Sequence, residues 1–394
     1  MKITVNHLTP AQCVLCGACR AACPAGAISF EHQHCGFSYP VIDGDRCISC
    51  QKCSAVCPVL HPPVAGPGEP DCCAAASPDD AVRAGSTSGG VFCEAARYVL
   101  SVGGYVCGAV FTEDFSVRHI ISRDPADVDA MRGSKYVQSD VGDCYERIRA
   151  LLRDGETVLF CGCPCQSAAL RTRLSGEDTG RLYIIDFVCH GIPSNETWHT
   201  YLSMQEKKHG APVTAVSFRS KRMGWHCSSM LLTFANGKEY VRPITEDAYF
   251  KGFLYSDTLK ESCYACPFRA YRSGSDLTVG DLWGAETLIP EADDNKGLSL
   301  VLTHTDAGRA LLSRLPLRRY DVSLADAAAH NPNLLRSPDR NVHRDLYYDL
   351  RDKKGETAAM KKYLSEKPHE TVRRVTLRGM RAVRARLTGK KNLY

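Results

Sequence analysis

The chain has 394 residues, of which 44% are hydrophobic and 24% are charged. This ordinary globular composition excludes disorder over most of the chain, and the length predicts two or three domains. The formal net charge is +5, but residues 371–394 carry six Arg and two Lys without an acidic residue. The rest of the chain is therefore mildly acidic, which argues against a basic nucleic-acid-binding body and predicts no nucleic-acid partner.

The sequence shows no pattern of a membrane or secreted protein. No apolar run approaches the roughly 18 residues of a membrane helix, and residues 1–20 lack the apolar core of a signal peptide. We therefore expect a cytoplasmic protein. Cysteine is unusually frequent, with 21 residues, and a disulfide scaffold would be shorter and secreted, so these thiols favour metal ligation.

Two runs of four cysteines share one spacing. The first is Cys13-x2-Cys16-x2-Cys19-x3-Cys23-Pro24, and the second is Cys47-x2-Cys50-x2-Cys53-x3-Cys57-Pro58. In bacterial two-cluster ferredoxins with this spacing, the fourth cysteine of each run binds the other [4Fe-4S] cluster. The ligand sets are therefore Cys13, Cys16, Cys19 and Cys57 for one cluster, and Cys47, Cys50, Cys53 and Cys23 for the other. Zinc knuckles, the alternative, use separated cysteine pairs and do not match two identical runs.

The remaining chain alternates short apolar runs with helical patterns. Residues 61–70 contain four Pro and two Gly, which is typical of a linker. The patterns that follow predict helices at 90–102, 128–131, 145–152 and 341–363, and strands at 104–111, 157–160, 182–188, 215–218 and 298–303. Interleaved helices and strands indicate an α/β or α+β fold.

Further cysteines stand in distinctive contexts beyond the linker. Cys263-x2-Cys266 has the spacing of a metal-ligand hairpin, which alone does not choose between zinc and iron–sulfur. Cys161, Cys163 and Cys165 follow a predicted strand, and Cys189 stands in a Cys-His-Gly sequence. The other cysteines are expected to be small buried side chains.

Eight segments in order resemble the family of coenzyme F420 hydrogenase/dehydrogenase beta subunits. They are GSTSGGVF (85–92), GSKYVQS (133–139), VLFCGCPCQSAAL (158–170), DFVCHGIPS (186–194), FRSKRMGW (218–225), CYACPF (263–268), DLTVGDLWG (276–284) and NKGLSLV (295–301). The resemblance implies FAD and a third [4Fe-4S] cluster held by Cys165, Cys189, Cys263 and Cys266. Cys163 departs from the family, which usually has Thr there, and Cys161 is also not typical.

The resemblance also completes the expected domain order. It comprises a two-[4Fe-4S] ferredoxin domain at 1–62, a linker at 63–80, a mixed α/β domain binding FAD and a cluster at 81–340, and a charged helical region with a basic tail at 341–394. The tail approximates an amphipathic basic helix, suited to weak contact with an anionic membrane surface or an acidic partner, or it is a solvated end.

The flavin-binding residues follow from the same resemblance. Gly85, Ser86, Thr87, Ser88, Gly89 and Gly90 precede a predicted helix, where backbone N–H groups and hydroxyls can hold a pyrophosphate, or where they simply cap the helix. Lys135 and Tyr136 are candidates for the flavin ring or its phosphates, with a solvated surface Lys as the alternative. His190 is a candidate proton donor or a packing residue, and Asp281 lines the pocket or caps its strand. Together, Lys135 and His190 are the catalytic candidates.

The expected activity is an electron relay. Ferredoxin-type clusters pass single electrons through the third cluster to FAD, which exchanges hydride with an organic acceptor that resembles coenzyme F420. A redox donor or acceptor protein, or a hydrogenase-like partner, would supply or take the electrons, and the number of low-potential clusters favours an anaerobic cell. The alternatives are a non-catalytic subunit docking to a larger redox enzyme, and a reductase of another substrate, for example in cell-surface polysaccharide metabolism.

Overall fold

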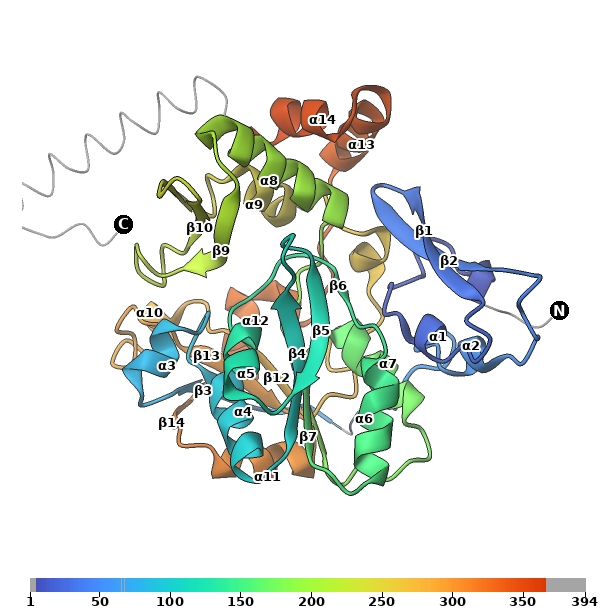
Figure 1. Cartoon of the computed structure of the whole chain (residues 1–394). Coiled ribbons are helices and arrows are strands. Elements are labelled where there is room, and N and C mark those ends of the chain that lie inside the picture. The colour runs from blue at the N-terminus through green and yellow to red at the C-terminus, as the bar shows by residue number, and fades with distance from the viewer. Residues whose placement is uncertain (1–4, 65, 67, 366–394) are drawn as a thin grey trace, which may run out of the picture. The chain divides into compact units, whose positions relative to one another are not determined.

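The structure is a computed structural model that describes residues 5–64, 66 and 68–365 (Figure 1). The chain forms two compact units. Unit 1 comprises residues 1–196 and 259–339, and unit 2 comprises the remaining segments, 197–258 and the described residues from 340 onward. None of the helices in the described ranges is long and apolar enough to cross a membrane. The predicted basic tail at 371–394 lies outside the described residues.

The N-terminal segment of unit 1 is a small ferredoxin-like fold. Its elements are η1 (Val5–His7), α1 (Ala18–Ala21), β1 (Ile28–His34), β2 (Phe37–Ile42) and α2 (Lys52–Ala55). Strands β1 and β2 form an antiparallel hairpin in which Ile28 pairs with Ile42. The two cysteine runs flank this hairpin, and each run passes through one of the two short helices.

The two cysteine runs repeat one backbone conformation. Leu15 and Gly17 have left-handed φ values of 56° and 80°, and Ser49 and Gln51, at the equivalent positions, have 54° and 61°. Three of these four residues carry a Cβ, and that conformation costs them energy. The repeated cost indicates that each run is shaped to turn its cysteines toward one point.

A nine-stranded mixed sheet forms the rest of unit 1. Its order is β14-β3-β13-β12-β8-β7-β4-β5-β6, and β12, β8, β7 and β4 run parallel to one another. The strands are β3 (Asp71–Ala76), β4 (Tyr105–Phe111), β5 (Val117–Ser122), β6 (Ser139–Asp140), β7 (Val158–Gly162), β8 (Leu182–Phe187), β12 (Leu277–Asp281), β13 (Ser299–Thr303) and β14 (Arg318–Asp321). The carboxyl ends of the four parallel strands therefore meet at one edge of the sheet, where α/β proteins bind ligands.

Helices cover both faces of this sheet. The helices of unit 1 are α3 (Asp80–Ala84), α4 (Val91–Ser101), α5 (Pro125–Met131), α6 (Cys144–Arg153), α7 (Pro164–Arg173), η2 (Glu261–Ala265), α10 (Ala285–Leu288), α11 (Asp306–Arg314), α12 (Leu324–His330) and η3 (Pro332–Leu334). Helices α4, α5 and α11 share one apolar core with the sheet. Helices α6 and α7 pack on a second core.

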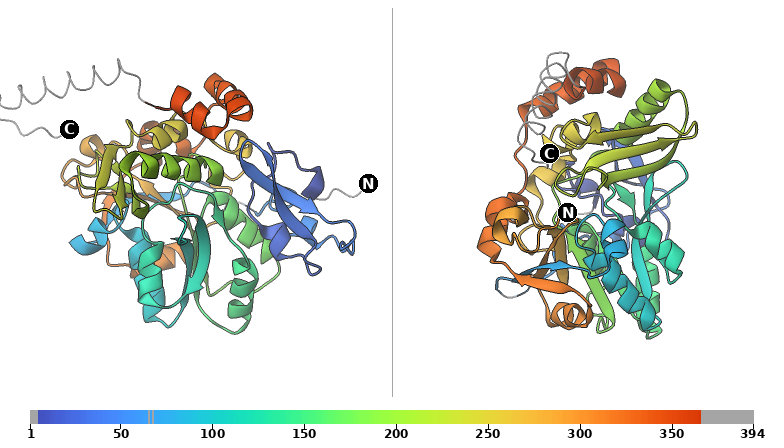
Figure 2. Two further views of the ribbon diagram at one scale, coloured as in Figure 1. Left: turned by 45° about the horizontal axis from the view of Figure 1, so that its top comes forward. Right: turned by 90° about the vertical axis from the view of Figure 1, so that its left-hand side faces the viewer.

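The ferredoxin-like segment packs against helices α6 and α7 (Figures 1 and 2). Val14, Cys16 and Val56 belong to the same apolar core as Phe160 of β7. The hydroxyl of Tyr145 in α6 donates a 3.0 Å hydrogen bond to the carbonyl oxygen of Cys16. The first cysteine run is therefore built into the interior of unit 1.

Unit 2 has its own sheet and core. A three-stranded antiparallel sheet in the order β11-β10-β9 combines β9 (Val213–Ser220), β10 (Ser229–Phe234) and β11 (Glu239–Pro243). The helices are α9 (Ala248–Leu254), α13 (Val342–Lys354) and α14 (Glu356–Tyr363), with most of α8 (Asn195–His209). The rings of Trp198, Phe218 and Tyr249 pack together, and the buried Asp247 accepts hydrogen bonds from Tyr201 and Tyr240 at 2.6 and 2.9 Å.

The predicted helices and strands are confirmed with shifts of a few residues at their ends, except that residues 341–363 form two helices, α13 and α14, separated at Gly355. Strand β3 was not predicted; it lies within residues 63–80, the expected linker, and pairs with β13 and β14. Its sequence, Asp-Cys-Cys-Ala-Ala-Ala, has weak strand propensity, but pairing on both sides decides its conformation. A ferredoxin-like segment followed by a mixed α/β domain with a large sheet is therefore the fold of this chain.

Candidate functional site

The cysteines predicted as one ferredoxin ligand set, Cys13, Cys16, Cys19 and Cys57, are all buried. We call them the inner site. Burial is the main cause that raises the pKa of each thiol, and the four are close enough for their negative charges to raise one another's pKa values. Backbone N–H groups donate to their sulfur atoms, for example that of Leu15 to Cys13.

The second set, Cys47, Cys50, Cys53 and Cys23, lies nearer the surface, and we call it the outer site. Cys47 and Cys50 are exposed, whereas Cys53 and Cys23 are half-buried. The backbone N–H of Ala27 donates a 3.3 Å hydrogen bond to the sulfur of Cys23. The charge of Cys53 acts on both Cys19 and Cys57, so the outer site is adjacent to the inner one.

Cys165, Cys189, Cys263 and Cys266 line one cavity in unit 1. We call these four the third site. Cys165 is the second residue of α7, the helix that follows β7, and Cys189 lies just after the end of β8. Cys263 lies in η2 and Cys266 follows it. Parallel strand ends and one distant turn thus bring together cysteines from three separate segments.

Close backbone contact joins the loop after β8 to the segment before η2. Pro193 forms a β-bridge with Leu259, and the backbone N–H of Lys260 donates to the carbonyl oxygen of Ile192 at 2.9 Å. A Cβ atom at Gly191 would lie 2.7 Å from a Leu259 methyl and 3.3 Å from the Cβ of Cys263. Glycine at this position therefore allows Cys189 and Cys263 to face the same cavity.

Cys163 adds a fifth thiol at the third site. Its side chain forms hydrogen bonds with Cys165 and Cys189. The bond from Cys163 lowers the pKa of Cys165 to about 6 and also lowers the pKa of Cys189. Cys163 thus favours the thiolate form of two neighbouring cysteines, which is the form that binds metal.

Polar groups in the cavity wall suit an anionic metal–sulfur group. The buried Ser262 hydroxyl and the Nε of Arg269 line the cavity and have no hydrogen-bond partner among the described residues. The other guanidinium nitrogens of Arg269 donate to the carbonyl oxygens of His190 and Asn333 at 2.7 and 3.0 Å. An iron–sulfur cluster needs thiolate ligands, carries negative charge and has sulfides that accept hydrogen bonds. The four thiols supply the ligands, Ser262 and Arg269 supply free donors, and Arg269 and Lys260 supply positive charge.

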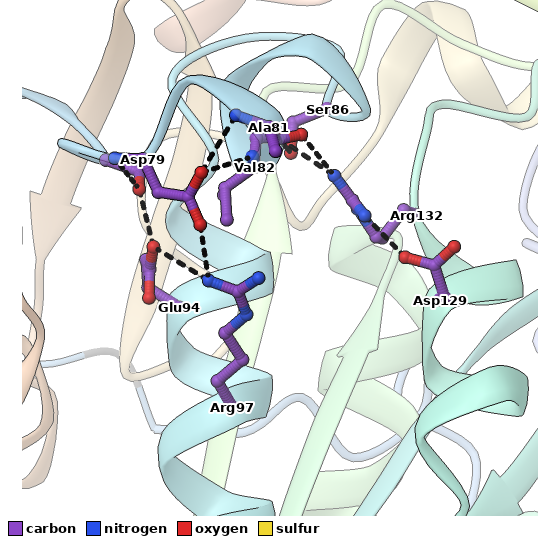
Figure 3. A network of polar contacts seen from close by, with 9 residues as sticks. Asp79, Ala81, Val82, Ser86, Glu94, Arg97, Asp129 and Arg132 are labelled. Carbon is purple, nitrogen blue, oxygen red and sulfur yellow. Dashed lines mark hydrogen bonds and ion pairs between the residues drawn. The ribbon is translucent and has the colours of Figure 1, made fainter.

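The turn at residues 85–90 is held by contacts within the chain, and Figure 3 shows Ser86 of this turn beside Val82 and Arg132. The hydroxyl of Ser86 donates to the carbonyl oxygen of Val82 at 2.7 Å, and that of Ser88 donates to the carbonyl oxygen of Leu298 at 2.8 Å. Thr87 accepts from the backbone N–H of Ser134 at 2.8 Å. The hydroxyl groups of Ser86 and Ser88 therefore donate within the chain, and the phosphate role expected of this turn stays a prediction.

The same turn packs tightly on the sheet. A Cβ atom at Gly89 would lie 2.2 Å from the carbonyl oxygen of Ala75 in β3 and 2.8 Å from the backbone nitrogen of Ser299 in β13. The neighbouring Arg132 donates to the carbonyl oxygens of Ala81 and Val82 at 3.3 and 3.0 Å, as Figure 3 shows. The turn thus packs closely against β3 and β13.

We expect Gly89→Ala to destabilise the protein by about 1–3 kcal/mol, because both nearest neighbours of the added methyl belong to backbone strands. The matched control is Gly44→Ala, whose Cβ meets no atom within 4 Å. Thermal unfolding of the two variants checks this expectation. Equal midpoints would show that β3 and β13 move apart to accommodate the methyl group without a loss of stability.

The other predicted flavin and catalytic residues lie near the same sheet edge but are engaged within the chain. Lys135 donates to the carbonyl oxygens of Met131, Arg132 and Gly133 at 3.2, 3.0 and 3.2 Å, and burial lowers its pKa to about 8.

His190 contacts the side chain of Asn333 at 3.0 Å. Tyr136 lies beside Lys135, and Asp281 ends β12.

Comparison with protein-family models matches most of the chain between residues 12 and 321. The N-terminal and C-terminal models of "Coenzyme F420 hydrogenase/dehydrogenase, beta subunit" match residues 72–144 and 155–321. A "4Fe-4S dicluster domain" model matches residues 12–60. The chain belongs to the family of coenzyme F420 hydrogenase/dehydrogenase beta subunits, an oxidoreductase-type family, and carries an N-terminal 4Fe-4S ferredoxin domain.

Two curated proteins and one solved structure are similar to the chain. One subunit of the F(420)H(2) dehydrogenase of Methanosarcina mazei is 25% identical over 193 residues, covering 45% of this chain and 53% of that protein, so the chain spans about half of its length. A ferredoxin-like protein in the nif region of Rhizobium leguminosarum bv. trifolii is 41% identical over 54 residues, covering 12% of this chain and 77% of that protein. A structure of the F420-reducing [NiFe] hydrogenase complex from Methanosarcina barkeri contains a chain with 16% identity and a TM-score of 0.46, and the match covers 76% of this chain and 93% of that one.

Proposed function

We propose that this protein is an electron-transfer oxidoreductase that moves electrons through the outer, inner and third cysteine sites toward the edge of the large sheet. The observation that carries the proposal is the convergence of Cys165, Cys189, Cys263 and Cys266 on one cavity, which Val14 of the first ferredoxin run also lines. The charge of Cys165 acts on Cys13 as well, so the third site directly adjoins the inner one.

Iron–sulfur clusters bound at the three sites would supply one-electron transfer. The chain contributes a gradient of exposure: Cys47 and Cys50 reach solvent, while the inner site is closed off from it. A redox partner would therefore approach the outer site. At the third site, Ser262 and Arg269 would donate hydrogen bonds that hold negative charge, and Cys163 would keep Cys165 and Cys189 ready to bind metal.

The family resemblance adds FAD and hydride exchange with an F420-like acceptor to the proposal. The side chains of Ser86, Ser88 and Lys135 donate within the chain, so we derive no step from them as flavin ligands. Flavin released from the purified protein tests this part: about one FAD per chain supports it, and its absence would restrict the chain to one-electron transfer.

A non-catalytic subunit that only docks to a larger redox enzyme is the second candidate. The family name and the Methanosarcina mazei relative, which is named as a subunit, favour a partner of this kind. The purified chain with a chemical reductant and oxidised F420 distinguishes the two. Steady turnover, seen as loss of F420 absorbance, supports an independent active site, whereas cluster reduction without turnover supports the docking subunit.

A further inference from the structure

Lys260 is a buried cation between two of the three cysteine sites. The residue is 2% exposed and lines the cavity of the third site. The ammonium group donates to the carbonyl oxygen of Val14 at 2.5 Å and to the side-chain oxygen of Gln138 at 3.1 Å. Val14 lies between Cys13 and Cys16, so this one hydrogen bond reaches the backbone of the inner site.

The ammonium group of Lys260 is adjacent to both sites. The acceptors of its two hydrogen bonds are neutral oxygens, so neither cancels its charge. Lys260 lines the cavity of the third site together with Cys165 and Cys263, and its acceptor Val14 directly follows Cys13 of the inner site. The ammonium group donates both bonds as a cation, and its charge faces the inner and the third site together.

Resting on the electron-transfer function proposed above, we infer that Lys260 is a shared counter-charge that sets the reduction potentials of the inner and third sites and connects them through its bond to Val14. Each one-electron reduction adds one negative charge to a site. A fixed positive charge in a buried, weakly screened position stabilises that added charge and so raises the potential. Because one cation serves both sites, its loss lowers both potentials.

Lys260 also holds two segments together, and this positioning role must be separated from its charge. The residue follows Leu259, whose bridge to Pro193 shapes the third site, and precedes Cys263 by three positions. A substitution that disturbs this packing would lower the iron content of the third site. A substitution that changes only the charge would leave the iron content unchanged and shift the reduction potentials. Variants that differ in charge at this position therefore decide between the two roles.

The experiment compares Lys260→Gln and Lys260→Arg in the full chain after anaerobic purification. Potentials are measured by EPR-monitored titration with dithionite, and iron is counted for each variant. A Cys263→Ser background, which lacks the third site, isolates the inner-site signal. For Lys260→Gln we expect wild-type iron content and, at a fixed potential, about a tenfold lower ratio of reduced to oxidised cluster at the inner and third sites, equal to about 59 mV. Lys260→Arg restores the ratio, and the outer site does not change.

Unchanged potentials in Lys260→Gln would overturn the inference, as would equal shifts in the Gln and Arg variants. If Lys260→Gln loses iron from the inner or third site while Lys260→Arg retains it, the requirement for a cation is supported. If both variants lose iron equally, Lys260 serves packing alone and the inference is wrong. Absence of a third cluster from the wild type would contradict the proposed function, yet the inner-site shift would remain measurable in the same samples.

Discussion

Replacing Cys263 by Ser is expected to remove about four irons per chain and to leave about eight. The sulfur of Cys263 faces the cavity that the other three cysteines of the third site line, and a serine hydroxyl is a poor ligand for iron in such a cluster. The inner and outer sites draw their cysteines from the N-terminal runs, so they should keep their iron. Iron and acid-labile sulfide, counted against protein, measure the change.

Cys227→Ser is the matched control for this experiment, because Cys227 lies in unit 2 and is not among the residues that line the cavity. It should retain the wild-type iron content. An unchanged iron content in Cys263→Ser would contradict the assignment of the third site. A loss of all iron would instead show that the three sites assemble only together.

Asp276→Ala is expected to cause the second large effect, a loss of about 3 kcal/mol or more of stability. The buried carboxylate of Asp276 forms two 2.8 Å hydrogen bonds with Arg171 and accepts from the backbone N–H of Ile184 and the hydroxyl of Thr305, both at 2.7 Å. Truncation leaves the guanidinium of Arg171 without its counter-charge and the N–H of Ile184 without an acceptor. Because Asp276 joins β12 to β8, the change also loosens the strand that leads to Cys189.

The thermal midpoint of the iron-loaded protein measures this loss, which corresponds to a decrease of several degrees. Asp306→Ala is the control, since the side chain of Asp306 is 99% exposed and its pair with Arg309 contributes about 0–1 kcal/mol. Equal midpoints for the two variants would show that the Asp276 network adds no stability beyond that of a surface ion pair.

Local features of the cysteine runs could be predicted from the sequence alone. A cluster fixes the spacing of ligands within one short run, so Cys13 and Cys47 could be assigned without any knowledge of the fold. The helix α4 and the strand β4 were also visible, because their apolar periodicity is local. In contrast, Cys165, Cys189 and Cys263 lie far apart in sequence, and only the resemblance connected them before the structure placed them at one cavity.

Features that depend on burial and strand pairing were missed. Periodicity and composition do not mark Lys260 as buried, since its ammonium group meets the carbonyl oxygen of Val14, a residue 246 positions away in the sequence. Its position three residues before Cys263 was the one available signal. The 85–90 turn was predicted to hold a phosphate, and the structure adds that the hydroxyl protons of Ser86 and Ser88 are donated to carbonyl groups of α3 and of the residue before β13. The phosphate role of this turn stays a prediction.

Anaerobic analysis of iron, acid-labile sulfide and released flavin in the purified chain tests the central claim most directly. Three occupied cysteine sites predict about twelve irons and an equal amount of sulfide per chain. About eight irons, with the four cysteines of the cavity still reactive toward thiol reagents, would contradict the third site and with it the proposed path of electrons to the sheet edge.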